Sequence, residues 1–169
     1  ANTTASNNTA HGLYALRANI TGANNTGVGS GALNANTTAD NNTAVGDAAL
    51  SANTTGAANT AVGKSCMNVA TGTGNTGLGA NAGLNVSSGD NNIALGRDSL
   101  RTGAPGGAQT TGDNKIGLGN SAITSAHIQV DWTVASDARD KTDFTALDLG
   151  LDFVKDLAPV TYKWDKRSK

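Results

Sequence analysis

The sequence predicts a mainly β fold: a repetitive parallel β-roll or β-solenoid fibre with a short C-terminal α+β segment. Three observations indicate this fold class. A five-residue phrase related to Asn-Thr-Ala-Val-Gly recurs at steps of 16 or 17 residues, with one step of 23. Glycine and asparagine recur every few residues, and each such glycine would cost a helix roughly 1 kcal/mol. The last 34 residues lose the repeat and carry 14 of the 25 acidic and basic residues.

The recurring phrase indicates a stack of similar units. A fixed short period is typical of repeat architectures, in which each unit contacts only its neighbours, and it argues against a compact enzyme. Residue 1 falls inside a partial repeat, so we expect the sequence to begin within a longer protein. The copies of the phrase begin at Asn8, Asn25, Asn42, Asn59, Asn75, Asn92 and Lys115.

The composition does not suit an ordinary globular domain. Only 29 of the 169 residues are Leu, Ile, Val or Phe, a share below the roughly 20% at which disorder is suspected. The net charge is only -1, whereas disorder normally accompanies high net charge. This balance gives no reason to expect a nucleic-acid partner. No run of 18 apolar residues is present, so we expect no membrane insertion.

Each repeat reads as a short strand, a bend at the glycine, and a second short segment. In the phrase, Thr26 and Val28 are expected to point one way, and Asn25 and Gly27 the other. The residue before the glycine is apolar in six of seven copies, and we interpret this position as a core slot. A second apolar position follows four residues after the glycine. The residues before the glycine are His11, Val28, Val45, Val62, Leu78, Leu95 and Leu118.

Two reactive residue types fall on repeat positions. His11 stands in the slot that is otherwise Val or Leu, so we interpret it as a variant at the end of the stack rather than a ligand. Cys66 occupies a position that is small in every copy, where a free thiol behaves as a modest hydrophobe. A structural role is therefore expected for both residues.

The thin core predicts association between chains. Each repeat offers about one pair of large aliphatic residues, and thin stacks usually obtain further burial from another chain. Three identical coils would place the same residue around a common axis, so we predict an in-register homotrimer. A free-standing solenoid monomer is the alternative.

The longest step contains an inserted loop, which we expect to lie at the surface. Insertions in stacks gather on one face and sometimes bind ligands. We therefore select Gly103, Pro105, Gln109 and Thr111 as candidate contact residues. No metal or cofactor is expected: His127 has no Cys or His partner at zinc spacing. The acidic residues Asp40, Asp47, Asp90 and Asp113 are interpreted as solvated turn residues rather than calcium ligands.

The repeat carries a resemblance over residues 1–123. The pattern Asn-Thr-Ala-Val-Gly-x-x-Ala-Leu resembles repeats of bacteriophage tail fibres and is similar to the β-roll heads of trimeric autotransporter adhesins. The resemblance implies a fibrous trimer without naming its partner.

A boundary is expected near residue 135. Residues 124–135 form a connector, in which the alternation from His127 to Val134 predicts a strand. Apolar residues then recur at spacings of 3 and 4, which predicts a helix over 145–157 that ends before Pro159. A short strand is expected at 160–164.

Residues 136–169 contain the strongest chemical signal. The run Ser136-Asp137-Ala138-Arg139-Asp140-Lys141, with the following helix and Pro-Val-x-Tyr-x-Trp strand, resembles the start of the endosialidase-type intramolecular chaperone of phage tail spikes and fibres. The resemblance implies a trimeric folding aid that is released by self-cleavage. By it, Ser136 would be the nucleophile and Lys141 its base, with Asp137 and Arg139 in support. A lysine serves as base when burial or nearby cations lower its pKa. Such a reaction occurs once per chain, so the protein is not an enzyme in the ordinary sense.

The leading functional hypothesis is a structural and attachment component of a viral tail fibre, located extracellularly in the virion. Expected partners are two further copies of the chain, other tail or virion proteins, and a host-surface glycan or protein receptor. A bacterial trimeric surface adhesin is the alternative, although residues 136–169 do not begin the heptad pattern of a coiled-coil stalk. An ice-binding solenoid is a third hypothesis, suggested by a column of threonines that Ile93 and Ile116 interrupt.

Overall fold

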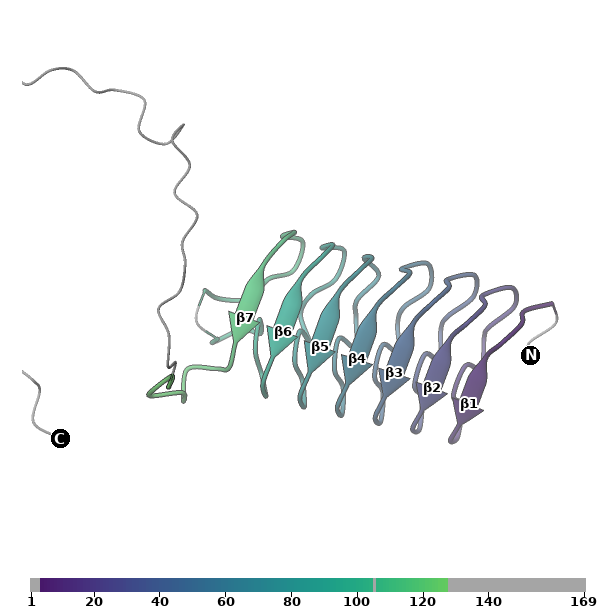
Figure 1. Ribbon diagram of the computed structural model, residues 1–169, viewed down its shortest axis with the longest axis horizontal. Coiled ribbons are helices and arrows are strands. Elements are labelled where there is room, and N and C mark those ends of the chain that lie inside the picture. The colour runs from purple at the N-terminus through teal and green to yellow at the C-terminus, as the bar shows by residue number, and fades with distance from the viewer. Residues whose placement is uncertain (1–3, 105, 128–169) are drawn as a thin grey trace, which may run out of the picture. The chain divides into compact units, whose positions relative to one another are not determined.

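A computed structural model describes residues 4–104 and 106–127, which fall in one compact unit ending at His127. This part of the chain is a parallel β-solenoid, with one three-residue strand in each coil (Figure 1). The strands follow one another in chain order in a single seven-stranded sheet. They are β1 (Thr9–His11), β2 (Thr26–Val28), β3 (Thr43–Val45), β4 (Thr60–Val62), β5 (Thr76–Leu78), β6 (Ile93–Leu95) and β7 (Ile116–Leu118).

The predicted fold class is confirmed. The described residues are mainly β and contain no helix, so none among them offers a helical membrane span. The helix expected at 145–157, the strand expected at 160–164 and most of the predicted connector strand lie outside the described residues.

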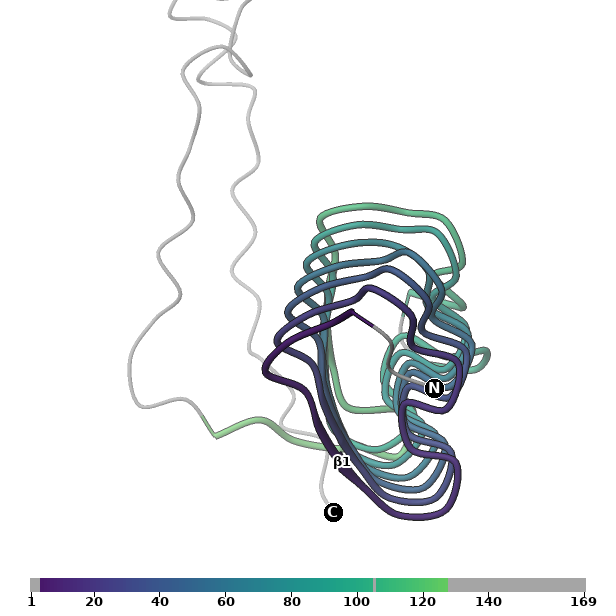
Figure 2. The ribbon, with the colours of Figure 1, turned by 90° about the vertical axis from the view of Figure 1, so that its right-hand side faces the viewer.

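The repeat period sets the register of the sheet. Thr26 pairs with Thr43 and Val28 pairs with Val45, so each residue lies beside its counterpart in the next coil. The register survives the 23-residue step, because Ile93 still pairs with Ile116. The six extra residues must therefore leave the coil as a loop. Viewed along the stack, successive coils nearly superpose (Figure 2).

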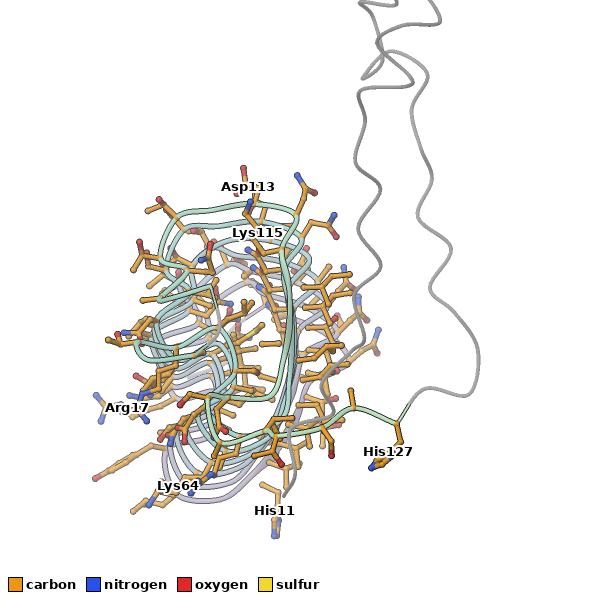
Figure 3. All side chains as sticks on the ribbon, turned by 90° about the vertical axis from the view of Figure 1, so that its left-hand side faces the viewer. His11, Arg17, Lys64, Asp113, Lys115 and His127 are labelled. Atoms are coloured by element: carbon orange, nitrogen blue, oxygen red, sulfur yellow. The ribbon has the colours of Figure 1, made fainter. Side chains whose placement is uncertain are left out.

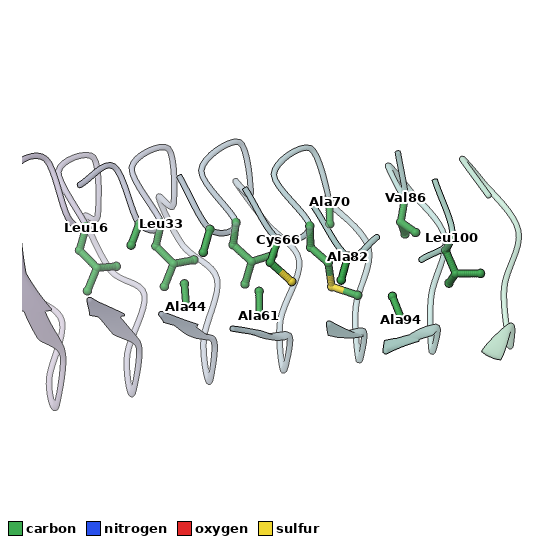
Figure 4. Close-up of a cluster of buried hydrophobic side chains, with 14 residues drawn as sticks. Leu16, Leu33, Ala44, Ala61, Cys66, Ala70, Ala82, Val86, Ala94 and Leu100 are labelled. Carbon is green, nitrogen blue, oxygen red and sulfur yellow. The ribbon is translucent and has the colours of Figure 1, made fainter. Parts of the chain in front are cut away.

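The core is a single row of side chains that runs through the coils (Figure 4). Each long member is fully or almost fully buried, and alanines and Cys66 fill the space around the row. The leucines adopt a left-handed backbone, with φ of 51° at Leu33 and 48° at Leu50, which costs an L-residue roughly 1–2 kcal/mol. Burial of the leucine side chain offsets this cost. The long members are Leu16, Leu33, Leu50, Met67 and Leu100, and Val86 is a further buried side chain of the same cluster beside the row.

Buried asparagines form a ladder beside this row. The Oδ1 atom of Asn42 accepts a hydrogen bond from the backbone N of Asn59 at 2.9 Å, and Asn59 does the same for Asn75. The ladder continues to Lys115, whose backbone N donates to Asn92 at 2.9 Å. A buried polar side chain is tolerated when it is hydrogen-bonded, and here each amide also joins one coil to the next. The phrase therefore begins with asparagine for a structural reason.

A second, shorter ladder contains Asn19, Asn36 and Asn53. Asn36 Nδ2 donates to Asn19 Oδ1 at 2.9 Å, and Asn53 Nδ2 donates to Asn36 Oδ1 at 3.3 Å. In the next two coils the same position is occupied by Ala70 and Val86, which are also fully buried. This interior position is therefore polar in three successive coils and apolar in the next two.

The interpretation of the residue before each glycine as a core slot was wrong. The predicted alternation is confirmed, but the middle residue of each strand points inward, and the flanking Thr and Val point outward. The interior has no room for a large residue here: a Cβ on Gly77 would lie 2.5 Å from Cys66 Sγ and 3.1 Å from Met67 Cγ. The small Ala or Gly of the strand therefore faces the core, and the larger apolar residue faces out. His11 is accordingly exposed and does not occupy a core position.

Candidate functional site

The outward side of the sheet carries two parallel columns of side chains, which we call the outer face. Because neighbouring strands are in register, equivalent residues lie in straight rows along the stack. The first column is Thr9, Thr26, Thr43, Thr60, Thr76, Ile93 and Ile116, and the second is His11, Val28, Val45, Val62, Leu78, Leu95 and Leu118.

The outer face carries no Asp, Glu, Lys or Arg side chain: its first column is mainly threonine, and its second is His11 followed by Val and Leu. Its largest side chains are exposed, with 65% of Ile116, 54% of Leu78 and 51% of Leu118 accessible to solvent. The ionisable side chains of Arg17, Lys64, Asp113 and Lys115 point away from the coil interior and belong to neither column (Figure 3). From β2 onward side-chain size increases along the chain, since Val gives way to Leu at β5 and Thr gives way to Ile at β6.

The outer face is suited to association rather than to chemistry. Entirely parallel sheets are normally covered on both sides, and here the coil covers only the inner side. Contiguous exposed apolar surface is typical of interaction sites. Six steps of about 4.8 Å between strands make this face about 29 Å long.

A polar pocket of about 280 Å³ lies next to the inserted loop, between β6 and the end of β7. Its charged lining is a cluster around Asp98. Arg101 Nη1 lies 2.7 Å from Asp98 Oδ1, and Arg97 Nε lies 3.5 Å from Asp98 Oδ2. The amide of Asn81 also donates to Asp98 at 3.0 Å. These hydrogen bonds, from Asn81 first and then Arg101, hold the pKa of Asp98 below its ordinary value.

The four predicted contact residues lie on or beside the inserted loop. Gly103 is exposed and lines the polar pocket. Thr111 is exposed, whereas Gln109 is half-buried and donates from Nε2 to the carbonyl of Gly106 at 2.8 Å. Pro105 lies outside the described residues. The loop is therefore exposed in part, and contact with a partner remains a prediction.

The predicted cleavage residues, Ser136, Asp137, Arg139 and Lys141, lie outside the described residues. Cys66 is fully buried in the slot predicted for it, and burial raises the pKa of its thiol to about 11. A neutral, inaccessible thiol is a poor nucleophile. Within the described ranges, no group of three His, Cys, Asp or Glu side chains is placed to bind a metal ion.

Two features were missed at the level of sequence. The asparagine ladder had a signal, because an asparagine opens six of the seven phrases at the repeat spacing. The outer face also had one, since Thr26 and Val28 were expected on the same side of the strand. What was lacking was the volume of the interior, which decides which side faces inward.

The comparisons with known proteins concern the end of the chain. Residues 136–169 match a family model described as the chaperone of endosialidase. The match confirms the resemblance noted for this segment, and it covers the last 34 of 169 residues. No curated protein and no solved structure matches the chain. The chain is thus a parallel β-solenoid that leads into a segment similar to the endosialidase chaperone family.

Proposed function

We propose that this chain is a segment of a trimeric fibre of the phage tail-fibre type, which a chaperone segment at residues 136–169 helps to fold. The observation that carries the proposal is the order of the two parts: a solenoid with seven strands precedes, in sequence, the residues that match the chaperone family. Identical coils favour slipped pairings between chains, so a folding aid at the end of the stack has a physical purpose. The role in a virion, outside the cell, follows from the resemblance to tail fibres.

The exposed outer face supports association with two further copies of the chain. Its Leu78, Ile116 and Leu118 are each more than half accessible in the single chain. Burial of apolar surface is the main favourable term in association. The interior of the solenoid holds only about one long apolar side chain per coil. Burial of further apolar surface between chains would therefore add to stability.

The experiment is a mass measurement on the 169-residue chain by light scattering coupled to size exclusion. A mass three times the chain mass of 16.8 kDa is expected. A monomer at micromolar concentration would contradict the proposal. Circular dichroism of the same sample distinguishes a folded β-rich monomer from an unfolded chain.

Self-cleavage belongs to the same proposal. The hydroxyl of Ser136 would attack the carbonyl carbon of Ala135 while Lys141 takes the hydroxyl proton. The C–N bond between Ala135 and Ser136 would then break, with the proton passed from Lys141 to the released amino group of Ser136. Water would hydrolyse the resulting ester, which leaves a carboxylate on Ala135 and restores the Ser136 hydroxyl. Asp137 and Arg139 would support the two groups. Intact mass spectrometry of the full-length protein with and without Ser136→Ala tests this step. Two fragments are expected only with Ser136 present, and an uncleaved chain in both samples would rule the step out.

Attachment to a host is the outermost part of the proposal. The inserted loop and the polar pocket with Arg97 and Arg101 offer an exposed polar surface to a glycan or protein receptor. Other tail proteins would contact the ends of the stack. The match at residues 136–169 favours the fibre over an autotransporter-like adhesin, since it stands where such an adhesin would begin its stalk. Binding of labelled protein to host cells, with and without replacement of the loop by a two-residue turn, tests the receptor role.

A further inference from the structure

We propose that the outer face is the surface through which copies of this chain contact one another, and that the larger side chains of β5–β7 fix their register. The inference rests on the trimeric fibre proposed above and specifies how that fibre is assembled. It assigns a role to the two outward columns, which residues 4–104 and 106–127 leave uncovered.

The rows of the outer face differ in the side chains that they present. A row of β2 or β3 presents one Thr and one Val, both partly buried, and carries no charge. The rows of β6 and β7 present Ile and Leu, again without charge. The exposed apolar side chains Leu78, Leu95, Ile116 and Leu118 therefore gather at the β5–β7 end of the face, and their burial against a like surface is favourable.

The partner that fits the outer face is another copy of the chain. A partner surface must offer uncharged apolar rows at the inter-strand spacing over the full length of seven strands. The same face of a second copy meets this condition, because its rows have the same spacing and the same number. Rows β2–β7 carry no Asp, Glu, Lys, Arg or His, so they have no like-charge repulsion with their counterparts in a second copy. Cyclic arrangements of identical chains are the common form of such assemblies.

The two ends of the outer face disfavour a slip of one chain against another. A slip by one coil costs little along β2–β4, because each of these rows is Thr with Val. The cost rises at the C-terminal end, where Ile116 and Leu118 of one chain would project past the partner and stay exposed. At the other end, a slip would place the imidazole of His11 against a valine row. The apolar gradient therefore favours the in-register pairing.

A depression beside the largest row adds to this end of the face. It is apolar, has a volume of about 360 Å³, and is open to solvent. Its lining is Leu95, Gly96, Leu118, Gly119, Ile123 and Ala126. A side chain from a neighbouring copy in register would fill it, because the same Leu and Ile residues of that copy lie at the same height along the axis.

Disulfide cross-linking tests the face. All variants carry Cys66→Ala, a change to the residue found in the same slot at Ala49. Two separate variants, Thr60→Cys and Val62→Cys, place a cysteine in each column of one coil. Whichever column lies nearer the trimer axis is thereby sampled. The control is Thr55→Cys, which is exposed in the same coil but lies outside the sheet. Under mild oxidation we expect chain-to-chain disulfides from at least one column and none from Thr55→Cys.

Co-expression of two variants tests the register. Chains with Thr43→Cys are mixed with chains with Thr60→Cys, and Val45→Cys with Val62→Cys. A mixed disulfide then reports a slip of one coil. In-register assembly predicts same-position disulfides with few mixed ones.

A second background removes the gradient and leaves the fold intact, since it changes only outward side chains to those of the earlier coils. It combines Ile93→Thr, Leu95→Val, Ile116→Thr and Leu118→Val. We expect the fraction of mixed disulfides to rise several-fold in this background. An unchanged fraction would overturn the role of the gradient.

The outcomes separate the two proposals. If the unmutated chain is a monomer by mass, the trimeric fibre itself is wrong. If the mass is that of a trimer, but Thr55→Cys cross-links and neither column of β4 does, the trimer stands and the outer face is not its interface.

Discussion

The side chain of Met67 fills the space that Gly83 leaves in the next coil. A Cβ on Gly83 would lie 3.0 Å from Met67 Cγ and 3.2 Å from Met67 Cε. Gly83 stands where other coils carry the inward Leu of the core row, so one long, flexible residue serves two coils here. Methionine suits irregular gaps because it is unbranched.

This relationship predicts coupling between the two positions. Gly83→Leu alone should destabilise the chain by about 1–3 kcal/mol through over-packing against Met67. Met67→Leu should recover part of that loss in the double variant, because the pair then matches Leu33 and Leu50. Denaturation of both single variants and the double variant measures the coupling, expected at about 1 kcal/mol or more. Strict additivity would contradict the shared packing.

The bend glycines predict a sharp contrast between two substitutions. Gly46 has φ of +138°, and a Cβ there would lie 2.6 Å from the carbonyl carbon of Gly63. Gly46→Ala should therefore cost more than about 3 kcal/mol, since strain and a backbone clash combine.

The matched control is Gly31→Ala. Gly31 has φ of +69°, and its Cβ would meet only Ala48 Cα, at 4.0 Å. Ala48 occupies the equivalent position with φ of 55°, so Gly31→Ala should cost about 1 kcal/mol. Thermal melts of the two variants test the difference, and equal losses would speak against the role of the bend.

The asparagine ladder predicts a cost for its interior members. Asn59 donates from Nδ2 to the carbonyl of Gly72 at 2.8 Å and accepts from the backbone N of Asn75 at 2.9 Å. Asn59→Ala leaves both buried groups without these partners, at an expected cost of about 3 kcal/mol.

A milder loss is expected for Asn8→Ala. Asn8 makes the same two kinds of hydrogen bond, to the carbonyl of Gly22 at 2.8 Å and from the backbone N of Asn25 at 2.9 Å, but it is only half-buried in the first coil, where water can replace them. Chemical denaturation should place Asn59→Ala clearly below Asn8→Ala in stability. Equal losses would show that burial does not set the cost of breaking the ladder.

Cys66 predicts a loss of stability in alkali. Burial raises the pKa of its thiol from 9.0 to about 11, so the folded chain keeps a proton that the unfolded chain releases. The stability from this group is complete below pH 9 and is lost as the pH rises towards 11. Two pKa units correspond to about 3 kcal/mol.

The control for this prediction is Cys66→Ala. Its stability should not show the same fall between pH 9 and pH 11, because alanine does not titrate. Thiol labelling at pH 8 gives a second readout: the folded chain should react slowly and the denatured chain fast. Rapid labelling of folded protein would contradict the burial of Cys66.

The repeat period was enough to predict a parallel stack, its register, and the slot of Cys66. These depend only on one coil lying over the next at a fixed interval. The inward face was not predictable by hydrophobicity, because Ala44 and Asn42 face the core while Val45 faces out. That choice follows from contacts between coils, such as the closeness of Gly77 to Cys66, and from hydrogen bonds that join Asn42 to its neighbours.

The candidate site was likewise predictable from the sequence only in part. The inserted loop was located correctly by a break in the period, and Gly103 does line a polar pocket. The pairing of Asp98 with Arg101 was not foreseen, since neither residue stands out in sequence. The roles of Ser136 and Lys141 remain predictions.

Each coil offers to the next the same pattern of amides, glycines and small residues that it receives from the one before. Gain or loss of one 17-residue unit by gene duplication or deletion would therefore create no new kind of contact. It would change the length of the stack by about 4.8 Å. Such a protein can evolve its reach in small, equal increments while both of its ends stay the same.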